Sequence, residues 1–283
     1  MNAIARLFAA VLVTVVTALL TVAHGIDQAA QSGDAFLDGI GETSLVARYA
    51  LQNNAEDSSR NQSHATVRGT ANFVDDPVFQ RAVLLTGDGS YLQLPGKTLD
   101  GEDTISITGW LFLPTGASGP VFDFGRDAAN RLFATASRDG LLASVVLNGA
   151  VRNARAVTVA ENQWLHFAVV LDPAAHTLST YVDGARVAQA MDVNVTATQV
   201  MANGGADGLF LGRSHKDGEA TLHGRLRDVR IYRVNSFRIA RAAFCPDAAV
   251  IPPPGWVPAP HMYNPAIGVR YCAQPSSGRI VNN

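Results

Sequence analysis

Oxygen-bearing side chains crowd one short stretch, residues 52–64, where Asn, Asp and Ser follow one another closely. Calcium is a hard cation that takes about six to eight oxygen ligands. Asp57, Ser58, Ser59 and Asn61 offer carboxylate, amide and carbonyl oxygens within five residues. Short polar side chains of this kind also bond their own backbone in Asx turns. The stretch therefore predicts a calcium loop, with simple Asx turns as the alternative.

The sequence lacks the motifs that mark several other kinds of active or binding site. It has no Gly-x-Ser-x-Gly elbow, and Gly212–His215 follows a predicted strand without leading into a helix. The seven histidines do not fall at zinc-ligand spacing, and the two cysteines are too far apart for a Cys-x-x-Cys knuckle. The glycines at 87–89 and 204–205 precede strands, so they indicate turns and not phosphate cradles. A nucleophilic triad, zinc and a nucleotide are all unsupported.

Charge and composition restrict the partners further. The 22 basic and 24 acidic residues give a net charge of -2, and the sequence contains no run of consecutive basic residues. Nucleic acid is therefore not an expected partner. Charged residues make up only 16%, while Val, Ala, Gly and Thr are abundant, and this composition favours a sheet-rich globular protein over a disordered one.

The elements that position these residues are strands, and residues 164–188 define them best. Leu165, Phe167, Val169 and Leu171 recur at every second position, as on one face of a strand, until Asp172-Pro173 interrupts the run. A second strand then ends at Asp183-Gly184, a pair that accepts the positive φ angles of a type I′ turn. Trp164–Ala188 is therefore predicted to form three consecutive antiparallel strands.

The same rhythm of short strands and turns extends over most of the chain. No long helical period appears before residue 233, which excludes alternating βαβ units and favours an all-β sandwich of two antiparallel sheets. The other predicted strands are 45–50, 71–74, 82–86, 91–94, 104–113, 121–124, 132–137, 141–147, 208–212 and 224–232.

Four segments together resemble the laminin-G-like jelly roll of the concanavalin A-like lectin/glucanase superfamily. The resemblance covers about residues 44–233 and departs from the usual pattern at Arg60 and Arg227. It predicts that Trp110 and Trp164 are buried. The segments are the Trp164–Gly184 strands, VARYALQNNAEDSSRN at Val46–Asn61, TISITGWLF at Thr104–Phe112, and FLGRSHKDGEATLHGRLRDVRIY at Phe210–Tyr232.

The resemblance makes the calcium hypothesis more specific. Members of this superfamily often hold a structural calcium between the Asp-rich loop and the closing strand, where Asp228 matches. The predicted metal ligands are therefore Asp57, Asn61 and Asp228. In the alternative, Asp57 and Asn61 make Asx turns and Asp228 bonds backbone amides.

The resemblance also implies a function. The Glu-x-Asp-x-(x)-Glu strand of the superfamily's β-glucanases is missing, and Asp pairs such as Asp75-Asp76 or Asp123 with Asp127 are expected to be solvated turn carboxylates. We therefore expect a noncatalytic binding module for carbohydrate. The alternatives are a protein-binding or adhesive cell-surface module, and an accessory domain of a glycoside hydrolase or a weak hydrolase. Candidate sugar contacts are Tyr91, Phe133, His215 and the loop Ser214–Thr221.

Both ends of the chain differ from the sandwich. Residues 1–25 contain the apolar run Leu7–Ala23 and are predicted to be a signal peptide, or else an uncleaved membrane anchor. Export to a secreted, periplasmic or extracellular location follows in either case. Residues 26–43 form a predicted linker and 44–233 the jelly roll domain.

The tail, residues 234–283, is rich in Pro and contains Cys245 and Cys272. It is either a segment laid over the sandwich and stapled by a disulfide between these cysteines, or sequence unrelated to the domain. In the chain-entropy model, a disulfide between these cysteines would stabilise the folded state by roughly 3 to 4 kcal/mol. Two free thiols are the alternative.

Overall fold

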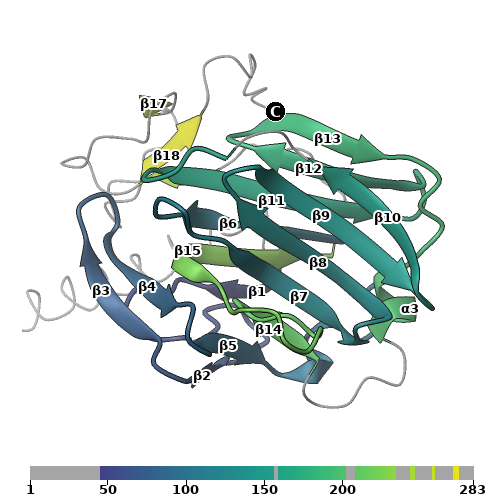
Figure 1. The fold of residues 1–283 in the computed structure, drawn as a ribbon, viewed down its shortest axis with the longest axis horizontal. Coiled ribbons are helices and arrows are strands. Elements are labelled where there is room, and N and C mark those ends of the chain that lie inside the picture. The colour runs from purple at the N-terminus through teal and green to yellow at the C-terminus, as the bar shows by residue number, and fades with distance from the viewer. Residues whose placement is uncertain are drawn as a thin grey trace, which may run out of the picture.

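The structure is a computed structural model, and it describes residues 45–155, 159–201, 208–233, 243–245, 257–258 and 270–273. Two antiparallel sheets lie face to face in this part of the chain (Figure 1). The prediction of an all-β sandwich of two antiparallel sheets is therefore confirmed. The predicted signal segment 1–25 and linker 26–43 lie outside the described residues, as does most of the tail.

One sheet has eight strands, and β15 joins its two halves by pairing with β6, β4 and β1. Its strands, in order from one edge, are β13 (Ala185–Ala190), β12 (Thr177–Val182), β11 (Trp164–Asp172), β6 (Ile105–Phe112), β15 (His223–Tyr232), β4 (Gln80–Thr86) and β3 (Asn72–Asp76), with β1 (Leu45–Tyr49) beside β15.

The other sheet has seven strands. They are, in order, β10 (Ala150–Arg155), β9 (Gly140–Leu147), β8 (Asn130–Ser137), β7 (Gly119–Asp127), β14 (Leu209–Leu211), β5 (Tyr91–Leu94) and β2 (Thr66–Arg68). Two short helices, η1 (Gly96–Leu99) and α3 (Ala197–Met201), lie in the connections. Among the residues that the structure describes, no helix is long and apolar enough to cross a bilayer.

The core fills the space between the sheets, and alternate residues of each strand build it. The four residues that predicted the strand β11, Leu165, Phe167, Val169 and Leu171, are all buried in this core. Strands β11, β12 and β13 form the predicted meander, with Phe167 opposite Val182 and Leu178 opposite Ala190. Asp183 and Gly184 both have positive φ, as a type I′ turn requires.

Trp110 and Trp164 are buried as predicted, but they belong to a second apolar cluster on the outer face of the eight-stranded sheet. Phe79, in the turn between β3 and β4, packs at 4.9 Å from Trp164 and 5.1 Å from Trp110 between ring centroids. The carboxylate of Asp76 accepts a hydrogen bond from Trp164 Nε1 at 3.2 Å. It also pairs with Arg225 Nη1 at 2.8 Å. The β3–β4 hairpin is therefore fixed to the sheet.

Two expectations about this fold were wrong. Asp75 and Asp76 were predicted to be solvated turn carboxylates, yet both belong to β3. Asp75 is solvated, with 97% of its side chain exposed, but Asp76 is buried, because Trp164 and Arg225 supply its partners. Strands β2 and β10 were not predicted. Both are edge strands whose residues are almost all exposed, so their sequences lack the apolar alternation that marks a half-buried strand.

His166 predicts how stability depends on pH. Burial lowers the pKa of His166 to about 3, Asp228 opposes this shift and Arg230 adds to it. The unfolded chain therefore takes up a proton below the ordinary pKa of 6.5 while the folded chain does not, so stability falls as the pH drops from 6.5 towards 3. We expect this one group to remove about 2 kcal/mol by pH 5.

Urea unfolding of the wild type and of His166→Gln at pH 7.5 and 5 measures this effect. The wild type should lose about 2 kcal/mol more than the variant over this interval. Equal losses in the two proteins would show that His166 is not held neutral by burial.

Candidate functional site

A buried carboxylate lies on the outer face of the seven-stranded sheet. Phe122 and Phe124 of β7 point into the core, so Asp123 between them points outward. Asp123 nevertheless has no exposed surface. Its partners come from β8 and from the loop that follows β14, which together cover it.

The Asp123 carboxylate accepts hydrogen bonds from three residues. Oδ2 lies 2.5 Å from Arg131 Nη1 and 3.0 Å from the backbone nitrogen of His215, while Oδ1 lies 2.9 Å from His215 Nδ1. Ser214 Oγ lies 3.3 Å from Oδ2 and accepts a bond from Arg131 Nη1 at 2.8 Å. Because a carboxylate only accepts, His215 Nδ1 carries a proton, and in the neutral ring Nε2 is left as an acceptor.

Two buried nitrogen atoms of this network have no partner among the residues that the structure describes: His215 Nε2 and Arg131 Nε. Both side chains are only 8% exposed. An unpaired buried polar atom costs about 1 to 3 kcal/mol, so such atoms are uncommon in folded proteins. One atom is an acceptor and the other is a donor, a pair suited to a hydroxyl group.

The local sequence explains how the loop reaches this place. Leu209 and Leu211 of β14 point into the core, and Phe210 between them points outward. Gly212 follows with φ of 86°, and a Cβ atom there would come within 2.4 Å of Leu85 Cδ1. A glycine is therefore needed at 212 for the chain to leave the sheet tightly and return Ser214 over Asp123.

A hollow of about 450 Å³ opens beside this network. The guanidinium of Arg213 lies 4.9 Å from the ring centroid of Tyr91 and 4.8 Å from that of Phe210, and its Nη1 donates to Tyr91 Oη at 3.0 Å. Arg68 Nε donates to Gln93 Oε1 at 2.9 Å. The lining residues are Arg68 from β2, Tyr91 and Gln93 from β5, Phe210 from β14, and Arg213.

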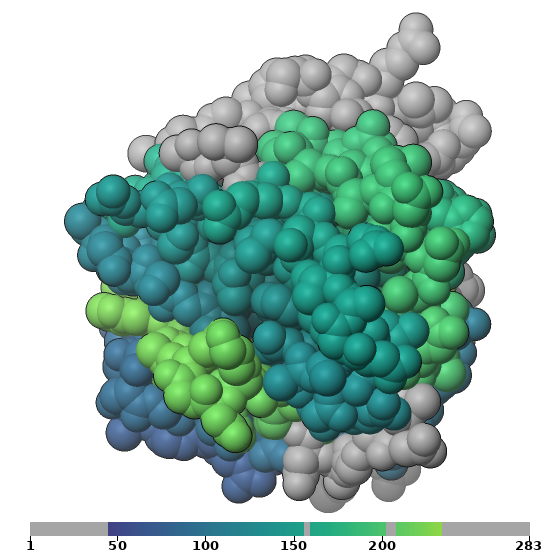
Figure 2. All heavy atoms as spheres, turned by 45° about the vertical axis from the view of Figure 1, so that its right-hand side comes forward, coloured from purple at the N-terminus to yellow at the C-terminus, as the bar shows by residue number. Residues whose placement is uncertain are grey.

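Phe210 joins the hollow to the Asp123 network, because its ring centroid lies 4.8 Å from that of His215 and 5.6 Å from that of Tyr91. The light-green segment 208–233, which contains β14 and the loop after it, reaches the surface between the blue N-terminal strands and the teal strands (Figure 2). The hollow and the network together are called the β14 face below.

Sequence reasoning found part of this site. Tyr91, His215 and Ser214 were candidates, and the structure brings them to one face. The guanidinium carbon of Arg131 lies over the ring of Phe133, 4.0 Å from the ring centroid. Arg68, Gln93, Phe210 and Arg213 were missed because no local pattern marks them. Asp123 was expected to be a solvated turn carboxylate, which was wrong: it is buried, and its partners Arg131, Ser214 and His215 lie 8, 91 and 92 residues away.

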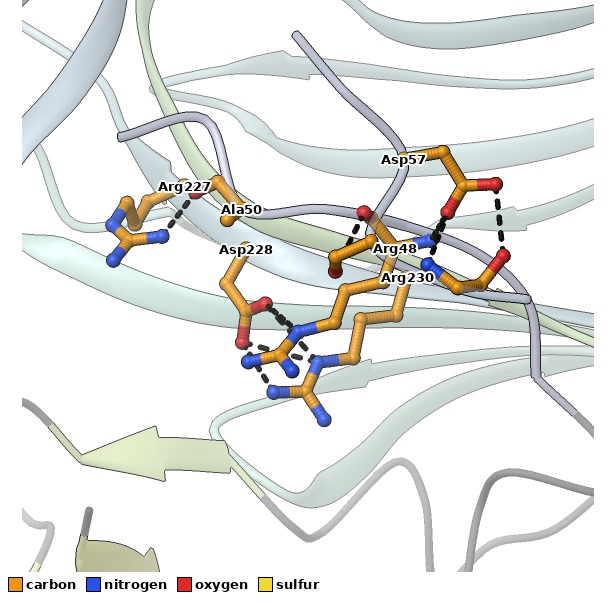
Figure 3. A network of polar contacts seen from close by, with 8 residues as sticks. Arg48, Ala50, Asp57, Arg227, Asp228 and Arg230 are labelled. Carbon is orange, nitrogen blue, oxygen red and sulfur yellow. Dashed lines mark hydrogen bonds and ion pairs between the residues drawn. The ribbon is translucent and has the colours of Figure 1, made fainter. Parts of the chain in front are cut away.

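Two of the predicted metal ligands, Asp57 and Asp228, lie on opposite sides of Arg48 (Figure 3). Asp57 accepts four hydrogen bonds, all at 2.8 Å, from the backbone nitrogens of Arg48, Ser59 and Ser63 and from Ser59 Oγ. Asn61 Nδ2 donates to the carbonyl oxygen of Val46 at 2.7 Å.

Asp228 is held by two guanidinium groups (Figure 3). Its Oδ1 lies 3.1 Å from Arg48 Nε, and its Oδ2 lies 2.7 Å from Arg230 Nη2. Burial raises the pKa of Asp228, but the charges of Arg230 and Arg48 outweigh burial and hold this pKa below its usual range. Asp228 has φ of 47° at a bulge of β15, where its backbone nitrogen and Arg227 both donate to the carbonyl oxygen of Ala50.

These residues do not fit a hard cation in this arrangement. Arg48 binds Asp57 through its backbone and Asp228 through its side chain, so a guanidinium lies where the calcium was expected. No cluster of three or more His, Cys, Asp or Glu side chains that could hold a metal occurs within the described ranges. Asp57 follows the predicted alternative of local turns, while Asp228 bonds arginine side chains and not backbone amides. The calcium binding that the sequence predicts is tested by melting the protein in calcium and in chelator.

The two cysteines lie on neighbouring strands of a third, small sheet. This sheet consists of β16 (Ala243–Cys245), β18 (Arg270–Ala273) and β17 (Val257–Pro258). Cys245 is opposite Arg270, and Cys272 is opposite Ala243, so the cysteines are offset by two residues. The disulfide stays a prediction.

The sequence comparison found one family model. The model described as the concanavalin A-like lectin/glucanases superfamily matches residues 86–235, more than half of the chain. A search of curated proteins found no match.

Solved structures share the fold at low sequence identity. Domain 4 of AbnA, a GH43 extracellular arabinanase from Geobacillus stearothermophilus in complex with arabinotriose, is 21% identical with a TM-score of 0.55, and the match covers 70% of this chain and 96% of that domain. The binding domain of Paraclostridial Mosquitocidal Protein 1 is 11% identical with a TM-score of 0.56, over 70% of this chain and 51% of the other.

Botulinum neurotoxin type C, which depends upon interaction with two ganglioside molecules to enter cells, is 11% identical with a TM-score of 0.52. That match covers 72% of this chain and 53% of the toxin chain. The chain thus spans about half the length of the two toxin structures and nearly all of the arabinanase domain. At these identities the likeness shows the fold alone.

The Arg48–Asp228 contact gives a test of what holds the closing strand. We expect Arg48→Met to lower the free energy of unfolding by about 3 kcal/mol, because it leaves a buried carboxylate with one guanidinium partner in place of two. Arg138→Met is the control, since Arg138 is 78% exposed in its side chain and should change stability little.

Thermal scans of the wild type in chelator and in millimolar calcium complete this test. Equal melting temperatures are expected, because the guanidinium groups already neutralise Asp228. A rise of several degrees in calcium would contradict this account and support a bound ion.

Proposed function

Because the chain belongs to the concanavalin A-like lectin/glucanase superfamily, we propose that it is a noncatalytic carbohydrate-binding module and that the β14 face is its binding surface. The fold alone does not decide function, since folds of this kind serve many ligands. The proposal therefore depends on the chemistry of the β14 face.

The observation that carries the proposal is the pair of unpartnered buried atoms, His215 Nε2 and Arg131 Nε. A sugar hydroxyl both donates and accepts hydrogen bonds, so it can satisfy either atom if the loop after β14 moves enough to admit it. The hollow beside them adds aromatic rings and planar polar groups, the mixture that fixes the orientation of a small ligand.

The burial and hydrogen bonding of Asp123 favour a binding role for this face over glycoside hydrolysis. Hydrolysis of a glycosidic bond by the common mechanism uses two carboxyl groups that reach the bond. Asp123 has no exposed surface, and its oxygens are occupied by Arg131 and His215. In this account Asp123 positions its two partners and does not react.

The similar structures support the same class of ligand. The arabinanase domain is described in complex with arabinotriose, and the neurotoxin with ganglioside interactions. The apolar run Leu7–Ala23 supports export of the chain, which would place the module where polysaccharides and cell-surface glycans are found.

A glycan array, followed by calorimetry with the best oligosaccharide, tests the proposal. We expect His215→Asn to weaken binding about tenfold, because the Asn amide can replace the Nδ1 donor to Asp123 but not the Nε2 acceptor. His176→Asn is the matched control, since His176 is exposed in the turn between β11 and β12 of the other sheet.

The control should bind as the wild type does, and both variants should melt close to it. The absence of any bound glycan at high protein concentration would refute the function. Unchanged affinity of a folded His215→Asn would refute this face as the site.

A further inference from the structure

The two arginines of the hollow differ from three other arginines of the molecule in their partners. Arg48, Arg131 and Arg225 each pair with a buried aspartate. Within the described ranges, Arg68 and Arg213 have no carboxylate partner, and their only hydrogen bonds are to Gln93 Oε1 and Tyr91 Oη. Terminal N–H groups of both guanidinium groups therefore remain available at the hollow.

The hollow has an excess of positive charge. Its five lining residues include two arginines and no acidic residue, although the whole chain carries a net charge of -2. A concave surface lined by charges of one sign concentrates ligands of the opposite sign. The hollow therefore selects against cations and favours an anionic group.

The aromatic rings of the hollow are not arranged for stacking against a neutral sugar. The Arg213 guanidinium lies over both Tyr91 and Phe210, within 5 Å of each ring centroid, and Phe210 is only 5% exposed. A sugar that stacked on these faces would have to displace the arginine. The rings instead hold the guanidinium in place, so that less side-chain freedom is lost when it binds a ligand.

From these observations we propose that the hollow recognises an acidic sugar, a uronic acid whose carboxylate lies between Arg213 and Arg68. This inference rests on the proposed carbohydrate-binding function and names the ligand class of the same face. A planar carboxylate matches the fork of an arginine and accepts two parallel N–H bonds. The Gln93 amide is close enough to Arg68 to contact a neighbouring hydroxyl of such a sugar.

The experiment compares charged and neutral forms of the same oligosaccharides. Trimers of galacturonic, glucuronic, mannuronic and guluronic acid, each with its carboxyl-methyl ester as the neutral counterpart, are titrated into the protein by calorimetry. At least one acid form should bind tenfold or more tightly than its ester. Its affinity should fall by a similar factor between 20 and 500 mM NaCl, because the pairs are near the surface.

Variants assign the effect to the two arginines. Arg213→Gln and Arg68→Gln should each remove tenfold or more of the affinity for the acid and lower the affinity for the ester by a clearly smaller factor, because only the acid loses a charge pair. Arg68 is exposed on the edge strand β2, so its variant tests the proposal even if loss of Arg213 disturbs the packing on Tyr91. Arg138→Gln removes the same charge from a distant turn and should bind as the wild type does.

The outcomes separate this inference from the proposed function. Esters that bind as tightly as the acids would overturn the acidic-sugar proposal while the carbohydrate-binding function stands. If Arg138→Gln lost as much affinity for the acid as the hollow variants do, the acidic-sugar proposal would also be overturned. The loss would then come from the change in net charge and not from the hollow. Failure of every acid and every neutral glycan to bind would overturn both.

Discussion

A buried carboxylate must be matched by donors that are equally removed from water, and Asp123 places this constraint on the whole β14 face. Transfer of an unpaired carboxylate from water into a protein interior costs several kcal/mol, so its partners must stay in position. Arg131 holds Asp123 from β8, and His215 holds it from the loop after β14. The position of that loop fixes the ring of His215 against Phe210 and brings Arg213 over Tyr91.

The same constraint recurs twice in the eight-stranded sheet. Asp76 binds Arg225 and Trp164, which fixes the β3–β4 hairpin over the outer tryptophan cluster. Asp228 binds Arg48 and Arg230, which joins β1 to β15 at the bulge of the closing strand. Each buried aspartate thus ties together elements that are distant in the sequence. Among the described residues, the arginines of the hollow have no such carboxylate partner, and the proposed binding surface differs from the internal pairs in this respect.

The sequence predicted the features that local chemistry determines. The alternation of Leu165, Phe167 and Val169 and the turn at Asp183-Gly184 were sufficient for the meander, because strand period and turn geometry depend on neighbouring residues. The edge strands β2 and β10 were missed, since exposed strands need no apolar alternation. The site was found only in part: Tyr91 and His215 are visible as residue types, but pairing with Asp123 depends on a contact across 92 residues.

The predicted calcium ligands are a second case in which a contact between distant residues could not be predicted from the sequence. Asp57, Asn61 and Asp228 were predicted to share a calcium, and the sequence did not reveal that Arg48 contacts both Asp57 and Asp228. A cation site and a guanidinium site use the same carboxylates. Only the arrangement in space tells them apart, because the arginine reaches Asp228 from a strand 180 residues earlier.

Backbone amide signals in NMR spectra, followed during titration with a uronic acid trimer, show where a ligand binds. If it binds on the β14 face, the largest shifts fall on β2, β5, β14 and the loop that follows Gly212. Shifts centred on β1 and the Asp57 loop, or on the outer face of the eight-stranded sheet around Trp110, would contradict the proposed site.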